Sequence, residues 1–168
     1  MKIVVPADEA QTREVMHWAA NYEGGVYIRI GRIKVGNVSS ENQHFNFGDA
    51  NRLREGKDIS IISTGGMVER SLKAADILNE KGISARVINI STIEPIDETE
   101  IIKAAKETSK ILTVEEAVTK GGLGAAVAAI IVRNNPVKME MMGIDSFAQT
   151  GSAEWLFEYF NLTPAGIA

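Results

Sequence analysis

The chain has 168 residues, of which 45% are hydrophobic and 24% are charged, and its net charge is −4 at pH 7. This fits one globular domain, or one domain with a piece of another. The negative charge and the lack of a basic cluster argue against binding to nucleic acid or an anionic membrane. The sequence has no cysteine, no apolar run long enough to span a bilayer and no segment that resembles a signal peptide, so we expect a cytoplasmic protein without disulfides.

The first 33 residues predict one strand-helix-strand unit. An apolar strand is expected at residues 2–6, and Asp8 is placed to cap a helix, with Gln11 three positions later. A glycine pair ends that helix before a second strand at residues 26–30. So small a unit cannot bury both faces of its strands, and we expect it to need a neighbouring sheet that this chain does not encode.

The stretch that follows, residues 31–57, is polar and shows no sustained hydrophobic period. A structureless segment of this length is improbable inside one compact domain. We therefore predict a linker at residues 34–58 that lies over a surface between two domains, anchored by Phe45 and Phe47.

From residue 59 onward, short apolar runs alternate with segments of helical periodicity. This alternation predicts an α/β fold, with a mainly parallel sheet covered by helices on both faces, and we assign it to residues 59–168. Strands are expected at residues 59–63, 84–90, 111–114 and 137–142, and the intervening helices are expected to begin after Gly66, Asp97, Gly122 and Ser152.

The turn Thr64-Gly65-Gly66 joins the first of these strands to its helix. A glycine turn at a helix N-terminus can bind an anion through backbone N–H groups. This turn lacks the lysine of a P-loop and the third glycine of a dinucleotide fingerprint. We favour a tight turn that lets the strand and the helix approach each other.

Two adjacent acids and two histidines are further candidates. Neighbouring residues on a strand point to opposite faces, so Glu115 and Glu116 are not expected to converge on one substrate, and we favour hydrogen bonding to the glycine turn at residues 121–124. His17 is expected to face solvent, and His44, in the linker, has no recognisable partner.

Arg29 and Arg32 stand at the end of the second predicted strand. Open parallel sheets bind ligands beyond the carboxyl ends of their strands, and the guanidinium fork is suited to phosphate. Arg32 lies past the strand end, where a ligand is expected. From position alone, a surface arginine paired with a nearby acid is an equal alternative.

Several motifs, taken in order, resemble the C-terminal part of the transketolase family over essentially the whole chain. They are VVPAD at residues 4–8, GVYIRIGR at 25–32, LREGKDISIISTGGMVERSLKAADIL at 53–78, EPID at 94–97, TVEE at 113–116, GGLG at 121–124 and GIDSF at 143–147.

The resemblance implies an enzyme of the pentose phosphate pathway that moves two-carbon ketol units between sugar phosphates. It implies a mixed five-stranded sheet, with residues 1–33 as the tail of a pyrimidine-binding domain and 59–168 as the C-terminal domain. Thiamine diphosphate and magnesium would be bound by an N-terminal portion or subunit, so this chain alone is expected to hold neither cofactor nor metal, to contribute no catalytic residue and to be inactive. Arg32 aligns with an arginine that contacts the substrate phosphate, and a homo-oligomer is expected.

Other assignments stay open at this point. Deoxyxylulose-phosphate synthase is similar in its C-terminal part, although YIRIGR at residues 27–32 differs from the YPRG-like sequence usual there. The beta subunit of a 2-oxo acid dehydrogenase is a third enzyme candidate. A non-catalytic assembly module that binds an anionic regulator at the 64–66 or 121–124 turn is the alternative from another class.

Overall fold

The computed structural model describes residues 1–39 and 45–168. Within these ranges, no helix combines the length and the apolar character needed to cross a bilayer. The elements, in chain order, are β1 (Lys2–Val4), α1 (Glu9–Ala20), β2 (Val26–Ile28), β3 (Asn51–Arg54), β4 (Ile59–Ser63), α2 (Met67–Glu80), β5 (Ala85–Asn89), β6 (Thr92–Glu94), α3 (Glu98–Thr108), β7 (Lys110–Val118), α4 (Leu123–Asn134), β8 (Lys138–Ile144), α5 (Ala153–Tyr159) and α6 (Pro164–Ile167).

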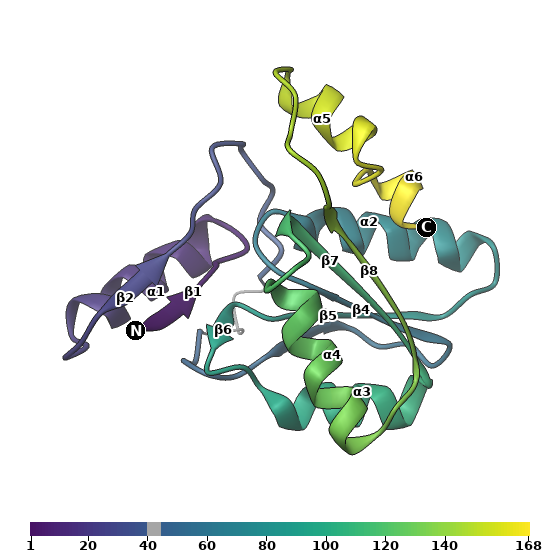
Figure 1. The fold of residues 1–168 in the computed structure, drawn as a ribbon, viewed down its shortest axis with the longest axis horizontal. Coiled ribbons are helices and arrows are strands. Elements are labelled where there is room, and N and C mark those ends of the chain that lie inside the picture. Colours follow the sequence, from purple (N-terminus) through teal and green to yellow (C-terminus); the bar gives the residue numbers. More distant parts are fainter. Residues whose placement is uncertain (40–44) are drawn as a thin grey trace.

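The main sheet has five strands in the order β3-β5-β4-β7-β8. The neighbouring strands β5 and β4, β4 and β7, and β7 and β8 pair in parallel, and β3 pairs antiparallel with β5. Helices α2, α5 and α6 lie on one side of this sheet, and α3 and α4 lie on the other (Figure 1). The predicted α/β fold, with a mixed five-stranded sheet between two helical layers, is confirmed.

The core is divided by the sheet, as two neighbours on β4 show. Ile61 packs in the cluster that includes Met67 of α2 and Phe157 of α5. Ile62 packs in the cluster on the opposite face, with residues of α3 and α4. Both isoleucines are fully buried, and each contributes about 2 kcal/mol of hydrophobic stabilisation. Alternation along a strand that is buried on both faces therefore holds the three layers together.

A second, smaller sheet has the order β2-β1-β6. β1 pairs in parallel with β2 and antiparallel with β6. The prediction that the first unit needs a sheet encoded outside this chain is wrong for this edge, because residues 92–94 supply the third strand. Three residues are too few to show a strand period, which is why the sequence pattern does not predict β6.

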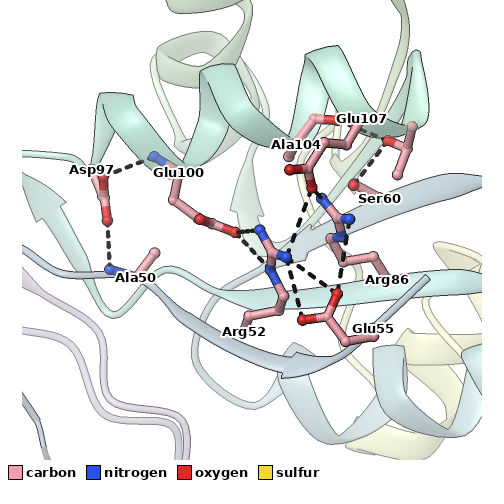
Figure 2. Close-up of polar contacts among 10 residues, drawn as sticks. Ala50, Arg52, Glu55, Ser60, Arg86, Asp97, Glu100, Ala104 and Glu107 are labelled. Atoms are coloured by element: carbon pink, nitrogen blue, oxygen red, sulfur yellow. Dashed lines mark hydrogen bonds and ion pairs between the residues drawn. The ribbon is translucent and has the colours of Figure 1, made fainter. Parts of the chain in front are cut away.

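The segment predicted as a linker contains one strand, β3, so the expectation that residues 34–58 have no regular structure is wrong there. Its polar sequence is explained by an ion-pair network that joins this edge strand to α3 (Figure 2). Arg52 pairs with Glu100 at 2.6 Å, and Arg86 of β5 pairs with Glu107 at 2.6 Å. Charged side chains on an edge strand hide the apolar alternation by which strands are predicted.

The phenylalanine anchors predicted for the linker are confirmed. Phe47 stacks on Trp18 of α1 with ring centroids 4.2 Å apart, and Phe45 meets the same indole edge-on at 5.9 Å. The backbone N–H of Phe45 also donates to Glu14 of α1. These contacts hold residues 45–47 against α1.

Candidate functional site

A cavity of about 600 Å³ lies between the small sheet and the main sheet. It is bounded by the segment after β2, the turn between β4 and α2, the end of β7 and the start of α5. Arg29 and Arg32 line it from the first of these segments, the Thr64-Gly65-Gly66 turn from the second and Glu116 from β7. The carboxyl ends of the parallel strands β4 and β7 therefore open on a cavity, as expected for a ligand site of an open α/β sheet.

The glycine turn forms one wall of this cavity. Gly65 has φ +59°, and a Cβ at this position would lie 3.0 Å from the side chain of Val5, which directly follows β1. The hydroxyl of Thr64 donates to the carbonyl of Val5 at 3.4 Å. The turn thus packs closely against the segment that follows β1, a contact that the sequence did not predict. In addition, Gly66 caps α2 without a side-chain hydrogen bond, and the helix begins at the cavity.

The two arginines differ in their surroundings. Arg29 is half-buried, and its guanidinium donates to the carbonyl oxygen of Glu116 at 3.4 Å. Arg32 is exposed, and across residues 1–39 and 45–168 its guanidinium forms no ion pair and no hydrogen bond. The alternative of a surface arginine paired with an acid is therefore not what the described part of the chain shows, and Arg32 is left available to a ligand.

The segment that carries Arg32 is fixed by two carboxylates. Glu69 accepts from the N–H of Gly36 at 3.1 Å, and Asp8 accepts from those of Val38 and Ser39 at 2.8 Å each. Burial alone would raise the pKa of Asp8, but these backbone N–H groups and that of Gln11 outweigh it and hold the pKa below its usual value. Asp8 thus stays ionised at neutral pH and supports this side of the cavity.

The adjacent glutamates of β7 point to opposite faces, as predicted. Glu115 is buried, and its carboxylate accepts from the N–H groups of Leu123 and Gly124 at 2.9 and 2.8 Å. The expected hydrogen bonding to the glycine turn is confirmed for Glu115. It is wrong for Glu116, which is half-buried and lines the cavity instead. A carboxylate at the N-terminus of α4 also complements the helix dipole.

Glu116 is the site residue that the sequence reasoning gave no separate role. Burial raises its pKa, and the positive charges of Arg29 and Arg70 only partly oppose that effect. The sequence signal for Glu116 was strand alternation. Because Glu115 bonds to the α4 turn, its neighbour Glu116 has to point to the opposite face of the sheet.

The remaining candidates lie outside this cavity. His17 is exposed on α1, as predicted. His44 falls outside the residues that the structure describes. Among the described residues, no three acids or histidines are grouped so that they could hold a metal ion. A second cavity, of about 540 Å³, shares Glu116 and Gly66 with the first and extends along α2 past Arg70.

Comparison with known proteins gives the family. Residues 48–167 match the family described as "Transketolase, C-terminal domain". The transketolase subunit SqwH of Clostridium sp. (strain MSTE9), named for 6-deoxy-6-sulfo-D-fructose, is 39% identical over 97% of this chain and 51% of its own length. One of the subunits of the apulose-4-phosphate transketolase of Phocaeicola vulgatus is 42% identical over 99% of this chain and 54% of its own length.

A solved structure agrees with these matches. The structure described as a split gene transketolase, inactive beta4 tetramer, superposes with a TM-score of 0.96 at 37% identity and covers 99% of this chain and 55% of that one. The chain thus spans about half the length of these three relatives. The resemblance found in the sequence is confirmed, and the chain belongs to the transketolase C-terminal domain family.

Proposed function

We propose that this chain is the C-terminal section of a transketolase that transfers two-carbon ketol units between sugar phosphates. The match to subunits of two transketolases over nearly all of this chain supports the assignment. The single observation that carries the role in substrate binding is Arg32, an arginine without a protein partner in the described structure, on a cavity at the ends of parallel strands.

In this proposal, the remaining half of the enzyme comes from an N-terminal subunit. That subunit holds thiamine diphosphate and magnesium, and the cofactor supplies the carbanion stabilisation that ketol transfer needs. Residues 1–33 of this chain complete a pyrimidine-binding domain, 34–58 link it to the C-terminal domain, and 59–168 form that domain. The chain has no turnover by itself, and the complete enzyme is a symmetric oligomer.

Arg32 binds the phosphate end of the sugar. A guanidinium donates two parallel hydrogen bonds to phosphate oxygens and stays charged at any working pH. Because the phosphate is remote from the reacting carbons, this contact positions the substrate and takes no part in bond making. The segment fixed by Asp8 and Glu69 keeps Arg32 at the cavity.

The test is reconstitution. The chain is mixed with the N-terminal subunit of the same organism, thiamine diphosphate, magnesium, a ketose phosphate donor and an aldose phosphate acceptor. We expect ketol transfer with both subunits present and none with either subunit alone. A complete mixture that consumes no ketose phosphate would contradict the proposal. In a second mixture, pyruvate replaces the ketose phosphate, and its consumption with release of carbon dioxide would identify a deoxyxylulose-phosphate synthase instead.

A titration of the chain with sugar phosphates separates the enzyme section from a non-catalytic module. We expect Arg32→Ala to abolish the heat of binding, because the guanidinium is the proposed phosphate ligand. Tight binding that is unchanged in Arg32→Ala would favour a regulatory anion site elsewhere on the chain.

A further inference from the structure

Glu116 occupies a distinctive place on the candidate site. Among the described residues that line the 600 Å³ cavity, it is the one acid, and the other charged side chains there are Arg29 and Arg32. It also lines the second cavity, so it stands where the two meet. Its Oε2 lies 3.7 Å from the point where a Cβ on Gly66 would be, which places the carboxyl beside the first residues of α2.

The carboxyl of Glu116 is not neutralised by a protein partner. In the described parts of the chain, it makes no hydrogen bond and no ion pair. The two arginines whose charges act on it are engaged otherwise. Arg29 donates to the main-chain oxygen of Glu116, and the guanidinium of Arg70 lies over the ring of Phe157 at 3.8 Å. A half-buried carboxyl without a partner favours its neutral form.

We propose that Glu116 tunes the affinity of this cavity for phosphate through its own protonation. The neutral acid donates a hydrogen bond to a bound phosphate oxygen, and the carboxylate repels the same group. This inference rests on the proposed function, because it takes the cavity to be the phosphate site. By linkage, a bound dianion draws a proton onto Glu116, so binding is accompanied by proton uptake.

The surrounding charges leave this titration to Glu116. The pKa values of Asp8 and Glu69 are lowered, Asp8 by backbone N–H groups that outweigh the effect of its burial and Glu69 first by its hydrogen bond with Lys73, so both remain ionised where Glu116 takes up a proton. The charged groups that line the two cavities together with Glu116 are Asp8, Glu9, Arg29, Arg32, Lys34, Glu69, Arg70, Lys73 and Glu154.

Sulfate is the probe for the test, because it remains a dianion from pH 5 to pH 8, whereas phosphate titrates in that range. Its binding to the full chain is measured by calorimetry across this range, in buffers of different ionisation enthalpy so that proton uptake is counted. We expect the affinity of the wild-type chain to fall with rising pH and binding to be coupled to proton uptake. In Glu116→Gln, we expect binding about tenfold tighter at pH 8, a flatter pH profile and less proton uptake.

Glu158→Gln is the matched control. Glu158 is exposed on α5 and lines neither of the two cavities, so the same change of charge there is expected to leave sulfate binding and proton uptake as in the wild type. Thermal unfolding of each variant shows that it is folded. Because proton uptake on binding is read directly, a purely structural role for Glu116 would not produce the expected result.

The inference is overturned if Glu116→Gln binds sulfate no more tightly than the wild type, or with the same proton uptake. It is equally overturned if sulfate binds to neither protein, because removal of a repelling charge has to reveal binding. Neither result touches the proposed function, which reconstitution with the N-terminal subunit decides. Failed reconstitution together with a Glu116-dependent sulfate site would keep the anion site and remove the transketolase assignment.

Discussion

The turns that precede α2 and α4 are similar in sequence and differ in what surrounds the helix N-terminus. Each follows a parallel strand, and each helix has a glycine N-cap, Gly66 or Gly122, without a side-chain hydrogen bond from that cap. At α4, the buried carboxylate of Glu115 accepts from two N–H groups of the first turn. At α2, the described structure shows no such carboxylate, and the helix begins at a cavity that Arg32 lines.

The difference comes from two adjacent residues on one strand. β7 sends Glu115 to the α4 turn and Glu116 toward the α2 turn, because successive side chains on a strand alternate. The carboxylate of Glu115 accepts hydrogen bonds from the N-terminus of α4. The carboxyl of Glu116 is half-buried beside the N-terminus of α2 and, within the described residues, has no hydrogen-bond or ion-pair partner. The same local sequence signal, a glycine turn before a helix, thus produces a structural cap in one place and a candidate ligand site in the other.

The largest effect is expected from Glu115→Ala. The change leaves two buried N–H groups without an acceptor and removes a charge that complements the helix dipole, so we expect a loss of about 3 kcal/mol in the free energy of unfolding. Urea denaturation measures it. Glu116→Ala is the control and is expected to cost less than about 1 kcal/mol. Equal losses in the two variants would contradict the view that a buried carboxylate stabilises the N-terminus of α4 but not that of α2.

A second pair of substitutions compares the glycines. A Cβ on Gly122 would lie 2.1 Å from Oε2 of Glu115 and 2.7 Å from the carbonyl of Val118, so Gly122→Ala is expected to cost about 2 kcal/mol. A Cβ on Gly66 would meet Val35 at 3.4 Å, an ordinary contact, and Gly66→Ala is expected to change stability by less than about 0.5 kcal/mol. Thermal unfolding measures the stability of both variants. A Gly66→Ala variant destabilised as much as Gly122→Ala would show that the α2 turn has no more room for a side chain than the α4 turn.

The smallest effect concerns pH. The pKa of Glu116 is raised in the folded chain by burial, so its contribution to stability is complete below the ordinary value of 4.5 and is lost as pH rises through the folded pKa. Glu116→Gln is therefore expected to match the wild type at pH 4 and to exceed it at pH 7, by less than about 1 kcal/mol. Urea denaturation at both pH values measures the difference. A variant less stable than the wild type at pH 7 would mean that the carboxylate is favourably paired.

The parts of the fold that were predicted correctly are those with local signals. Asp8, Asp97 and Ser152 each accept a hydrogen bond from an N–H three residues later, and the sequence predicted that a helix begins after each of them. Gly82 has φ +79°, the left-handed conformation in which a glycine commonly ends a helix. Alternation on β7 likewise predicted that the two glutamates diverge.

The parts that could not be predicted depend on contacts between distant segments. β3 is stabilised by pairing with β5 and by ion pairs of Arg52 with α3, and nothing within residues 51–54 signals it. Arg32 and the Thr64-Gly65-Gly66 turn line the same cavity, although a polar stretch without periodicity lies between them in the sequence. Sequence reasoning treated these as rival phosphate sites, and the structure places both on one cavity.

The most direct test of the account is the discrimination of the reconstituted enzyme between phosphorylated and unphosphorylated acceptor sugars. In Arg32→Ala, we expect kcat/KM for the phosphorylated acceptor to fall at least about tenfold while the value for the unphosphorylated sugar is unchanged, because a charged hydrogen bond to phosphate is lost. Arg133→Ala, at an exposed arginine in the last turn of α4, is the control and is expected to leave both values unchanged. An Arg32→Ala enzyme that keeps the full preference for the phosphorylated sugar would contradict the assignment of this cavity.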